Sequence, residues 1–290
     1  MNFITGVASP EGPTFLPDGS LLIVEMAASR GCVTHISADG KEKRVIAKTG
    51  RPNGLAIDSA MNIWVAESLY PALLKVSLDG KVETWLTGCD GEPFIWPNDL
   101  FFGPDGDLYM TDSGIDTKDF LTGDKPRPDY MALDFDGRLY RIQPKTRQIT
   151  RLDHHIRFTN GVAFGADGYL YANETMTGWV YRYKVDGDRV GVREAFGNVV
   201  DPFRKHVYRG PDGMKFAANG DLYVTVYGQG DVTVLDPEGK VKQRIPTQGK
   251  KPTNLAFGPD GQKKIYVTEV ELGNVECIEV ESAGMPLNIP

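Results

Sequence analysis

The sequence lacks the features that mark several common classes of protein. It has no apolar run long enough to span a bilayer, and its first residues, MNFITGVASPEG, lack the basic start and apolar core of a signal peptide. No cluster of Lys and Arg stands out, and the formal net charge is −7. A negative chain without a basic patch is a poor partner for nucleic acid. We therefore expect a cytoplasmic protein with no membrane and no nucleic-acid partner.

Cysteine is scarce and helical periodicity is absent. Cys32, Cys89 and Cys277 are odd in number and lack the spacing of metal ligands, so we expect reduced thiols without a function. No segment shows a helical period over ten residues. Apolar residues instead alternate around Gly-containing turns, as in GVAFGADGYLYANE and GMKFAANGDLYVTV, which is a strong hairpin signal.

A short apolar strand that opens with a polar residue and turns eight positions later occurs six times. The opening residues are Glu11, Asn53, Asn98, Asn160, Asp212 and Thr253. They lie 41 to 62 residues apart, the period of a four-stranded propeller blade. We predict an all-β fold, a six-bladed β-propeller with four-stranded blades and a central metal-binding channel, as a single domain over residues 1–290. The N-terminal MNFITGV is expected to complete the last blade and close the ring.

The geometry of a propeller turns this repeat into a prediction about chemistry. The innermost strand of each blade begins at one end of the central channel, so the six opening residues should converge on one axis. They offer only oxygen ligands, including two carboxylates, and such a set suits calcium better than zinc. The alternative is that these polar residues only line a water-filled tunnel.

One blade carries an insertion at about residues 113–136, SGIDTKDFLTGDKPRPDYMALDFD. A loop of this length in a compact domain is usually functional or disordered. It leaves from the face on which Asn98 lies, and Phe120, Leu121, Tyr130 and Met131 give it apolar anchors. We therefore predict a lid over the channel mouth, although the insertion could instead cover the edge of its blade.

A second set of acids lies about fourteen residues after the opening residues. Its members are Glu25, Glu67, Asp112, Glu174 and, after a two-residue insertion, Glu269. Because each hairpin returns to the face from which it started, these acids should lie beside the ring. Binding to backbone amides is the expectation for Glu25, Glu67 and Glu269. For Asp112, beside the insertion, catalysis or substrate binding is an equal alternative, and Glu174 is a further candidate.

The ordered motifs of the six repeats resemble a known family. The segments SPEGPTF, RPNGLAID, WPNDLFFGPDGDLYMTDSG, FTNGVAFGADGYLYANETMTGWVYRY, GPDGMKFAANGDLYVTVYG and KPTNLAFGPDG are similar to the senescence-marker-protein/gluconolactonase propellers, which are related to diisopropyl-fluorophosphatase. The resemblance implies a divalent ion held by Glu11, Asn160 and Asp212, with Asn98 as a further ligand or substrate contact. It also implies hydrolysis of lactones, chiefly sugar lactones, with phosphotriesters as substrates of some members.

A metal-dependent lactonase needs a cation to polarise the carbonyl and a carboxylate to accept the proton of the attacking water. Asp212 is the candidate that the resemblance implies, and Asp112 and Glu174 are alternatives. His206, six residues before Asp212, is a candidate proton carrier or oxyanion donor, or else a surface residue. Calcium is the expected ion, with zinc, magnesium and manganese as alternatives.

One departure from the family bears on the substrate. Some sugar-lactone hydrolases of the family have an Arg two positions before the Asn of the PND motif, where this chain has Trp96. A Trp offers a flat apolar wall, whereas an Arg binds hydroxyls and carboxylates. Other candidate pocket residues are Phe94, Phe120, Tyr130, Met176 and Tyr227. We therefore expect a less polar lactone as a rival to gluconolactone, unless Trp96 only packs under the insertion.

Two functions of other classes remain open. A calcium-binding regulatory propeller would keep the metal ring without hydrolysis, and an interaction module would use its exposed faces to bind proteins. The mixed chemistry of the ring and the aromatic insertion disfavour the interaction module, whereas an assay of lactone hydrolysis before and after chelation would separate the enzyme from the regulatory propeller. The sequence leaves the natural lactone and the oligomeric state open.

Overall fold

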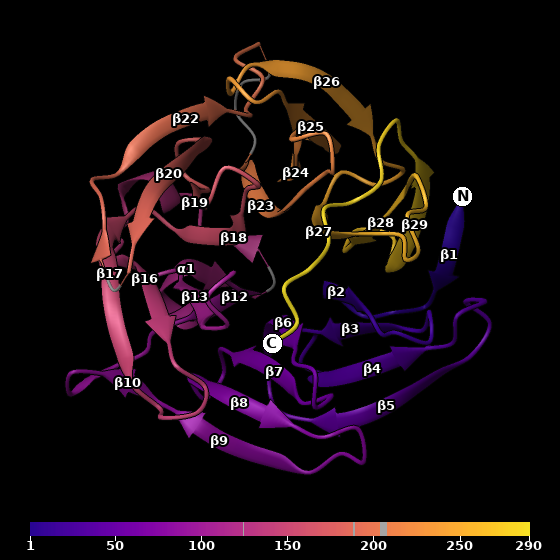
Figure 1. Cartoon of the computed structure of the whole chain (residues 1–290), viewed down its shortest axis with the longest axis horizontal. Coiled ribbons are helices and arrows are strands. Elements are labelled where there is room, and N and C mark those ends of the chain that lie inside the picture. Colours follow the sequence, from indigo (N-terminus) through magenta and orange to yellow (C-terminus); the bar gives the residue numbers. More distant parts are fainter. Residues whose placement is uncertain (124, 188, 204–207) are drawn as a thin grey trace.

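Six antiparallel sheets, five of four strands and one of five, surround one axis in the computed structural model, which describes residues 1–123, 125–187, 189–203 and 208–290 (Figure 1). The predicted six-bladed propeller is therefore confirmed. Among the described residues, no helix is long and apolar enough to cross a membrane.

The strands of each blade follow one another from the axis outward. The innermost strands are β2 (Pro10–Phe15), β6 (Pro52–Ile57), β12 (Pro97–Phe102), β18 (Thr159–Phe164), β23 (Gly210–Phe216) and β27 (Pro252–Phe257). The second strands are β3 (Leu21–Glu25), β7 (Ile63–Glu67), β13 (Leu108–Asp112), β19 (Tyr169–Glu174), β24 (Leu222–Tyr227) and β28 (Lys264–Glu269).

The outer half of each blade is more exposed. The third strands are β4 (Cys32–Ile36), β8 (Ala72–Val76), β16 (Gly137–Ile142), β20 (Trp179–Asp186), β25 (Asp231–Leu235) and β29 (Asn274–Glu279). The fourth are β5 (Lys43–Lys48), β9 (Val82–Leu86), β17 (Ile149–Ile156), β22 (Glu194–Asn198), β26 (Val241–Pro246) and β1 (Asn2–Thr5). Short ribbons are formed by β10 (Gly88–Cys89) with β11 (Glu92–Pro93), and by β21 (Arg189–Val190) with β20.

The chain closes the ring with its first strand. β1 pairs with β29, so that Thr5 lies opposite Asn274 in the last blade. In Figure 1, β1 lies beside the outer edge of β29. The predicted closure is confirmed, and its physical effect is to pair an edge that would otherwise be open.

The inner hairpins need a left-handed residue at their turns. Gly19 provides it in the first blade with φ 81°, but Met61 occupies the same place in the second blade with φ 61°. A side chain pays a steric cost for that conformation, which glycine avoids.

Apolar residues of neighbouring blades pack against each other and hold the inner strands in place. Leu22 and Val24 of β3 belong to the same buried cluster as Leu55 of β6 and Val65 of β7. Burial of each such side chain contributes about 1.5 to 3 kcal/mol. The start of every inner strand is thereby held on a rigid frame.

The insertion at residues 113–136 has short elements of its own. They are α1 (Thr117–Phe120), β14 (Leu121–Thr122), β15 (Lys125–Pro126) and the 3-10 turn η1 (Tyr130–Ala132). Phe120 is buried in an aromatic cluster with Trp96, Phe135 and Phe158. The insertion is therefore anchored on the third and fourth blades through its aromatic residues.

The C-terminal segment crosses the axis at the opposite end of the channel (Figure 1). The Asn288 side chain donates to the carbonyl oxygen of Phe102, the last residue of β12, at 3.0 Å, and the backbone N–H of Ser59 donates to the carbonyl of Pro290 at 2.8 Å. The repeat pattern of the sequence does not predict this crossing.

Candidate active site

A cavity of about 390 Å³ lies at the end of the channel where the inner strands begin. All six opening residues line it: Glu11, Asn53, Asn98, Asn160, Asp212 and Thr253. The predicted convergence of these residues is therefore observed. This convergence follows from the fold, because each of these residues is the second or third residue of an innermost strand.

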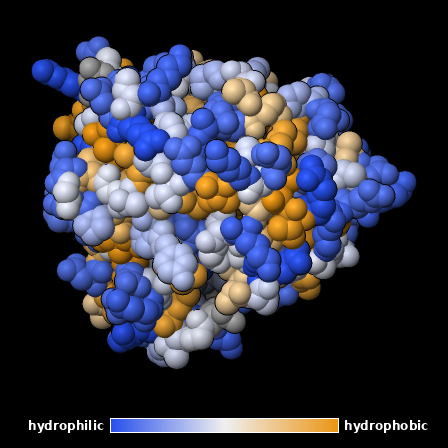
Figure 2. Space-filling model, turned by 90° about the horizontal axis from the view of Figure 1, so that it is seen from below, coloured by the Kyte–Doolittle hydropathy of each residue, from blue (hydrophilic) through white to orange (hydrophobic). Residues whose placement is uncertain are grey.

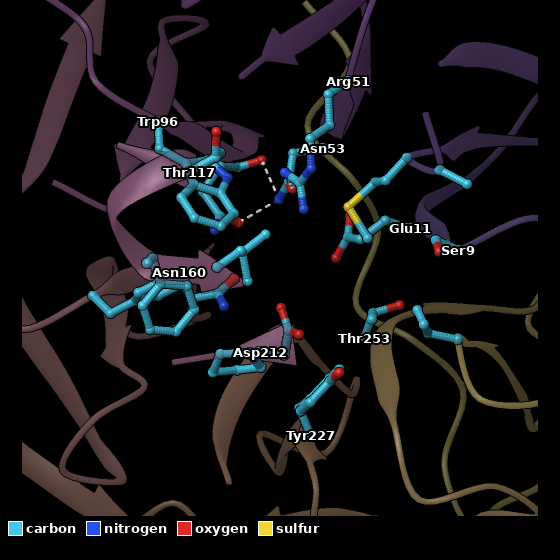
Figure 3. A pocket seen from close by; sticks show the side chains of 18 of the residues that line it. Ser9, Glu11, Arg51, Asn53, Trp96, Thr117, Asn160, Asp212, Tyr227 and Thr253 are labelled. Atoms are coloured by element: carbon cyan, nitrogen blue, oxygen red, sulfur yellow. Dashed lines mark hydrogen bonds between the residues drawn. The ribbon is translucent and has the colours of Figure 1, made fainter. Parts of the chain in front are cut away.

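Three of the six point their oxygens at a common space. Figure 3 shows the side chains of Glu11, Asn160 and Asp212 converging there. Glu11 Oε2 and Asn160 Oδ1 are buried and accept no hydrogen bond from any residue that the structure describes. Buried acceptors without a donor are costly unless something else binds them. The arrangement therefore has two open ligand positions beside the Asp212 carboxylate.

The other three opening residues have protein partners. Asn53 Nδ2 donates to Asn98 Oδ1 at 2.8 Å, and Asn98 Nδ2 donates to Ser113 Oγ at 2.8 Å. Thr253 Oγ1 donates to the carbonyl of Pro10 at 2.8 Å. Glu11 and Asn160 therefore keep open oxygens, whereas hydrogen bonds occupy Asn53, Asn98 and Thr253.

A third carboxylate, which sequence reasoning missed, lies next to this ring. Asp99 follows Asn98 and is 3% exposed. Its Oδ1 accepts the N–H of Leu100 at 2.9 Å and its Oδ2 accepts the N–H of Val162 at 3.3 Å. A signal was present in the sequence, because the equivalent position is glycine in four of the six blades: Gly12, Gly54, Gly161 and Gly213.

The glycines leave the room that Asp99 and Asn254 occupy. A Cβ at Gly54 would lie 2.8 Å from Oδ1 of Asp99, and a Cβ at Gly213 would lie 2.0 Å from Cγ of Asn254. A larger residue at either glycine would displace one of these two side chains. Glycines at these positions therefore make room for the side chains of Asp99 and Asn254 beside the ring.

Burial and mutual repulsion disfavour the charged forms of these acids. Burial raises the pKa of Glu11 well above its usual value, and the charges of Asp99 and Asp212 raise it further. Burial and the charge of Asp99 likewise raise the pKa of Asp212, against the opposing effects of Asn160 and Arg51. A dication placed among these carboxylates would offset their mutual repulsion and so lower their pKa values.

The donor set fits a hard divalent cation. It consists of the carboxylates of Glu11 and Asp212 and the amide oxygen of Asn160, and the described lining contains no His or Cys. Oxygen ligands of this kind suit calcium, magnesium or manganese better than a soft ion. The two unpartnered oxygens are the observation that supports a bound ion over a merely hydrated tunnel.

The second set of acids has a different role from the one considered for Asp112 and Glu174. Each acid accepts a backbone N–H just before the inner strand of its own blade. The pairs are Glu25 with Ala8, Glu67 with Arg51, Asp112 with Ile95 and Trp96, Glu174 with Arg157, and Glu269 with Lys251. As described by the structure, none of these acids lines the cavity. The expectation of backbone binding thus extends to all five.

Asp112 binds backbone amides instead of lining the cavity. Its carboxylate is fully buried and accepts the N–H groups of Ile95, Trp96 and Gly114 at 2.8 to 2.9 Å. Burial raises its pKa, against the effect of these hydrogen bonds. Asp112 therefore fixes the backbone that precedes Asn98 and does not line the cavity.

We expect Asp112→Ala to lower the free energy of unfolding by about 3 kcal/mol, because three buried N–H groups lose their acceptor. Urea denaturation would measure the loss, with Asp119→Ala, an exposed acid of the insertion, as the control. Unchanged stability combined with lost catalysis would return Asp112 to the catalytic machinery.

Trp96 lines the cavity as predicted, but it does not form a purely apolar wall. It is 4% exposed and packs edge-on against Phe120 and Phe158. The guanidinium carbon of Arg51 lies 4.7 Å from the centre of its ring. The cavity therefore has a cation stacked on its aromatic wall.

Arg51 is the second residue that sequence reasoning missed. It lines the cavity, and its Nη1 donates to Ser68 Oγ at 2.9 Å and to Asn53 Oδ1 at 3.4 Å. It stands two positions before Asn53, as Trp96 stands two positions before Asn98. The second blade thus has an arginine at the position where the third blade has Trp96.

The remaining predicted residues divide into two groups. Phe120, Leu121 and Tyr227 line the cavity. Phe94, Tyr130, Met131, Met176 and Glu174 are not part of the described lining. Tyr130 packs instead against Tyr208, which itself lines the cavity. His206 lies outside the described residues.

A family model described as the SMP-30/Gluconolactonase/LRE-like region matches residues 9–271. Among curated relatives, STRICTOSIDINE SYNTHASE-LIKE 3 of Arabidopsis thaliana is 29% identical over 61% of this chain and 43% of its own length. A gluconolactonase of Zymomonas mobilis is 24% identical over 87% of this chain and 74% of its own length. The chain thus spans less than half of the first relative and about three quarters of the second.

Solved structures share the architecture. A calcium-binding protein, regucalcin, from Agrobacterium tumefaciens superposes with a TM-score of 0.80 at 21% identity, covering 98% of this chain and 94% of the other. A gluconolactonase from Xanthomonas campestris superposes with a TM-score of 0.78 at 22% identity, covering 97% and 89%. At these identities the superpositions establish the fold.

Proposed function

Because the chain belongs to the SMP-30/gluconolactonase/LRE-like family, we propose that it is a divalent-cation-dependent hydrolase that opens a lactone ring. The single observation that carries this proposal is the pair of buried, unpartnered oxygens of Glu11 and Asn160 beside the Asp212 carboxylate. They face a cavity of about 390 Å³, which has room for a small cyclic ester.

Glu11, Asn160 and Asp212 would hold the cation, and Asn98 would add a ligand or contact the substrate. When bound, the ion supplies the positive charge that polarises a carbonyl and stabilises a developing oxyanion. Calcium suits the all-oxygen set best, and the likeness to a calcium-binding propeller supports that choice. Magnesium, manganese and zinc are the alternatives that a titration would separate.

Asp212 is the candidate to accept the proton of the attacking water. Glu11 is 2% exposed, whereas Asp212 is partly exposed to the cavity. A base must reach the water that it deprotonates, and the greater exposure of Asp212 favours it over Glu11, which lines the same cavity. Asp112 and Glu174 are weaker candidates, because the Asp112 carboxylate accepts backbone N–H groups and the Glu174 carboxylate accepts a backbone N–H and the Thr177 hydroxyl.

The substrate is proposed to lie between the ring of oxygens and the Trp96 face. The flat indole suits the face of a small ring, and Arg51 beside it suits a polar or anionic substituent. This combination favours a lactone that carries a carboxylate over a plain hydrocarbon lactone. Thr117, Lys118 and Phe120 of the insertion also line the cavity, which supports its proposed role as a cover over the substrate.

We expect chelation to abolish lactone hydrolysis and added calcium to restore it. A pH-indicator assay before and after treatment with a chelator, and again after each of calcium, magnesium, manganese and zinc, measures both. Thermal unfolding in parallel shows whether the protein stays folded without the ion. Activity that survives complete removal of metal contradicts the proposal.

Two other outcomes of the same assay identify the alternatives. Hydrolysis of an organophosphate ester faster than of every lactone tested would make the protein a phosphotriesterase. Tight calcium binding without hydrolysis of either class would make it a regulatory calcium-binding propeller.

A further inference from the structure

Two histidines and an aspartate meet on the surface, away from the lining of the central cavity. Asp136 ends the insertion, directly before β16, and His154 and His155 lie near the end of β17. β16 and β17 pair with Gly137 opposite Ile156, which brings the two segments together. None of the three residues belongs to the described lining of the cavity.

The side chains are arranged around one carboxylate oxygen. His155 Nδ1 lies 3.1 Å and His154 Nδ1 lies 3.9 Å from Asp136 Oδ1. One ligand atom from each residue lies within 4.8 Å of the others. Ligands of a tetrahedral zinc ion, at about 2.0 to 2.1 Å from the metal, are roughly 3.3 Å apart. The cluster therefore needs only small rotations to enclose an ion.

The surrounding structure holds the cluster in place. Asp136 Oδ2 accepts from Arg138 Nε at 2.9 Å, and Asp136 Oδ1 accepts the backbone N–H of His155 at 3.1 Å. His155 adopts φ 55°, a left-handed conformation that is uncommon for residues other than glycine. Hydrogen bonds to a ligating carboxylate are typical of metal sites, because they fix its orientation.

We propose that Asp136, His154 and His155 form a second metal site, for a transition-metal dication such as zinc. Two imidazole nitrogens and one carboxylate suit zinc and its neighbours, whereas calcium prefers oxygen ligands. The site differs in ligand chemistry from the central ring, and it does not depend on the proposed lactonase activity. The nearby charge of Arg138 opposes a cation, so this site binds more weakly than a closed structural zinc site.

A bound ion would connect the end of the insertion to the fourth strand of its blade. Asp136 also donates its backbone N–H to the carbonyl of Gly114 at 3.0 Å, so the two ends of the insertion are already linked there. The ion would strengthen the base from which the insertion extends over the cavity.

The test is a calorimetric zinc titration of the full chain in saturating calcium. We expect one equivalent of zinc to bind the parent protein, and that binding to be lost in His154→Ala/His155→Asn. Asparagine tolerates the left-handed conformation at position 155, so the double variant should keep its fold, which circular dichroism checks. His35→Ala, on β4 and partly exposed, is the matched histidine control and should bind as the parent does.

Cobalt in place of zinc gives an independent readout, because a tetrahedral nitrogen and oxygen site has visible absorption that the double variant should lack. The proposal is overturned if the parent binds no zinc or if the double variant retains the equivalent. It is also overturned if Asp212→Asn or Cys277→Ser removes the equivalent, since zinc would then occupy the central ring or a thiol site.

Discussion

Asp212→Asn should lose tight binding of the divalent cation and lactone hydrolysis together, with kcat/KM falling about a hundred- to thousandfold. The substitution keeps the size of the side chain but removes one of the two carboxylates that line the cavity among the described residues. It also removes the proposed base. Calorimetry of calcium binding and a lactone assay on the same preparation measure the two losses.

Asp260→Asn is the matched control, because Asp260 is exposed in the turn of the last blade and asparagine tolerates its φ of 54°. Parent-like calcium affinity in Asp212→Asn would remove Asp212 from the ligand set. Asn98→Ala makes a graded comparison. It should cost activity more than affinity, since Asn98 Oδ1 already accepts from Asn53. Equal losses would place Asn98 among the main ligands.

The second large effect concerns the choice of substrate. Arg51→Met should lower kcat/KM for a carboxylate-bearing lactone by about ten- to a hundredfold, the equivalent of one charge-assisted hydrogen bond, and change a neutral lactone little. Trp96→Ala should lower kcat/KM for both by a similar factor, because both rings lose their apolar wall. The ratio of kcat/KM for the two lactones is the quantity to measure.

Three further variants serve as controls for the effect on substrate choice. Arg44→Met removes an exposed arginine of β5 and should leave the ratio unchanged. Trp96→Phe keeps the contacts with Phe120 and Phe158 and should keep most of the activity. Trp96→Arg should shift preference toward polyhydroxylated lactones. If the ratio is the same in the parent, Arg51→Met and Trp96→Arg, these side chains only support the fold. The substrate argument is then wrong, although the metal-dependent hydrolysis is untouched.

Local periodicity was sufficient to predict the architecture and the ring. Each blade repeats the same hairpin, so the spacing from Glu11 to Thr253 gave the number of blades and the end of the channel at which these residues lie. The missing fourth strand of the last blade pointed to the N-terminal segment MNFITGV for the same reason, and the structure places β1 at Asn2–Thr5 within it. These features depend on distances along the chain, which a sequence displays directly.

The directions and neighbours of individual side chains depended on tertiary structure. The sequence placed Asp112 and Glu174 at the correct end of their hairpins, but only the folded chain shows that their carboxylates accept protein hydrogen bonds and do not line the cavity. Arg51 and Trp96 are 45 positions apart, and they stack because adjacent blades bring the same hairpin position side by side. Asp99 has room beside the ring because its neighbour on β6 is Gly54, and its charge raises the pKa of Glu11. The sequence by itself therefore determined the propeller and the set of oxygens at its mouth. Packing between blades decided which side chains share the cavity, because such contacts have no fixed separation along the chain.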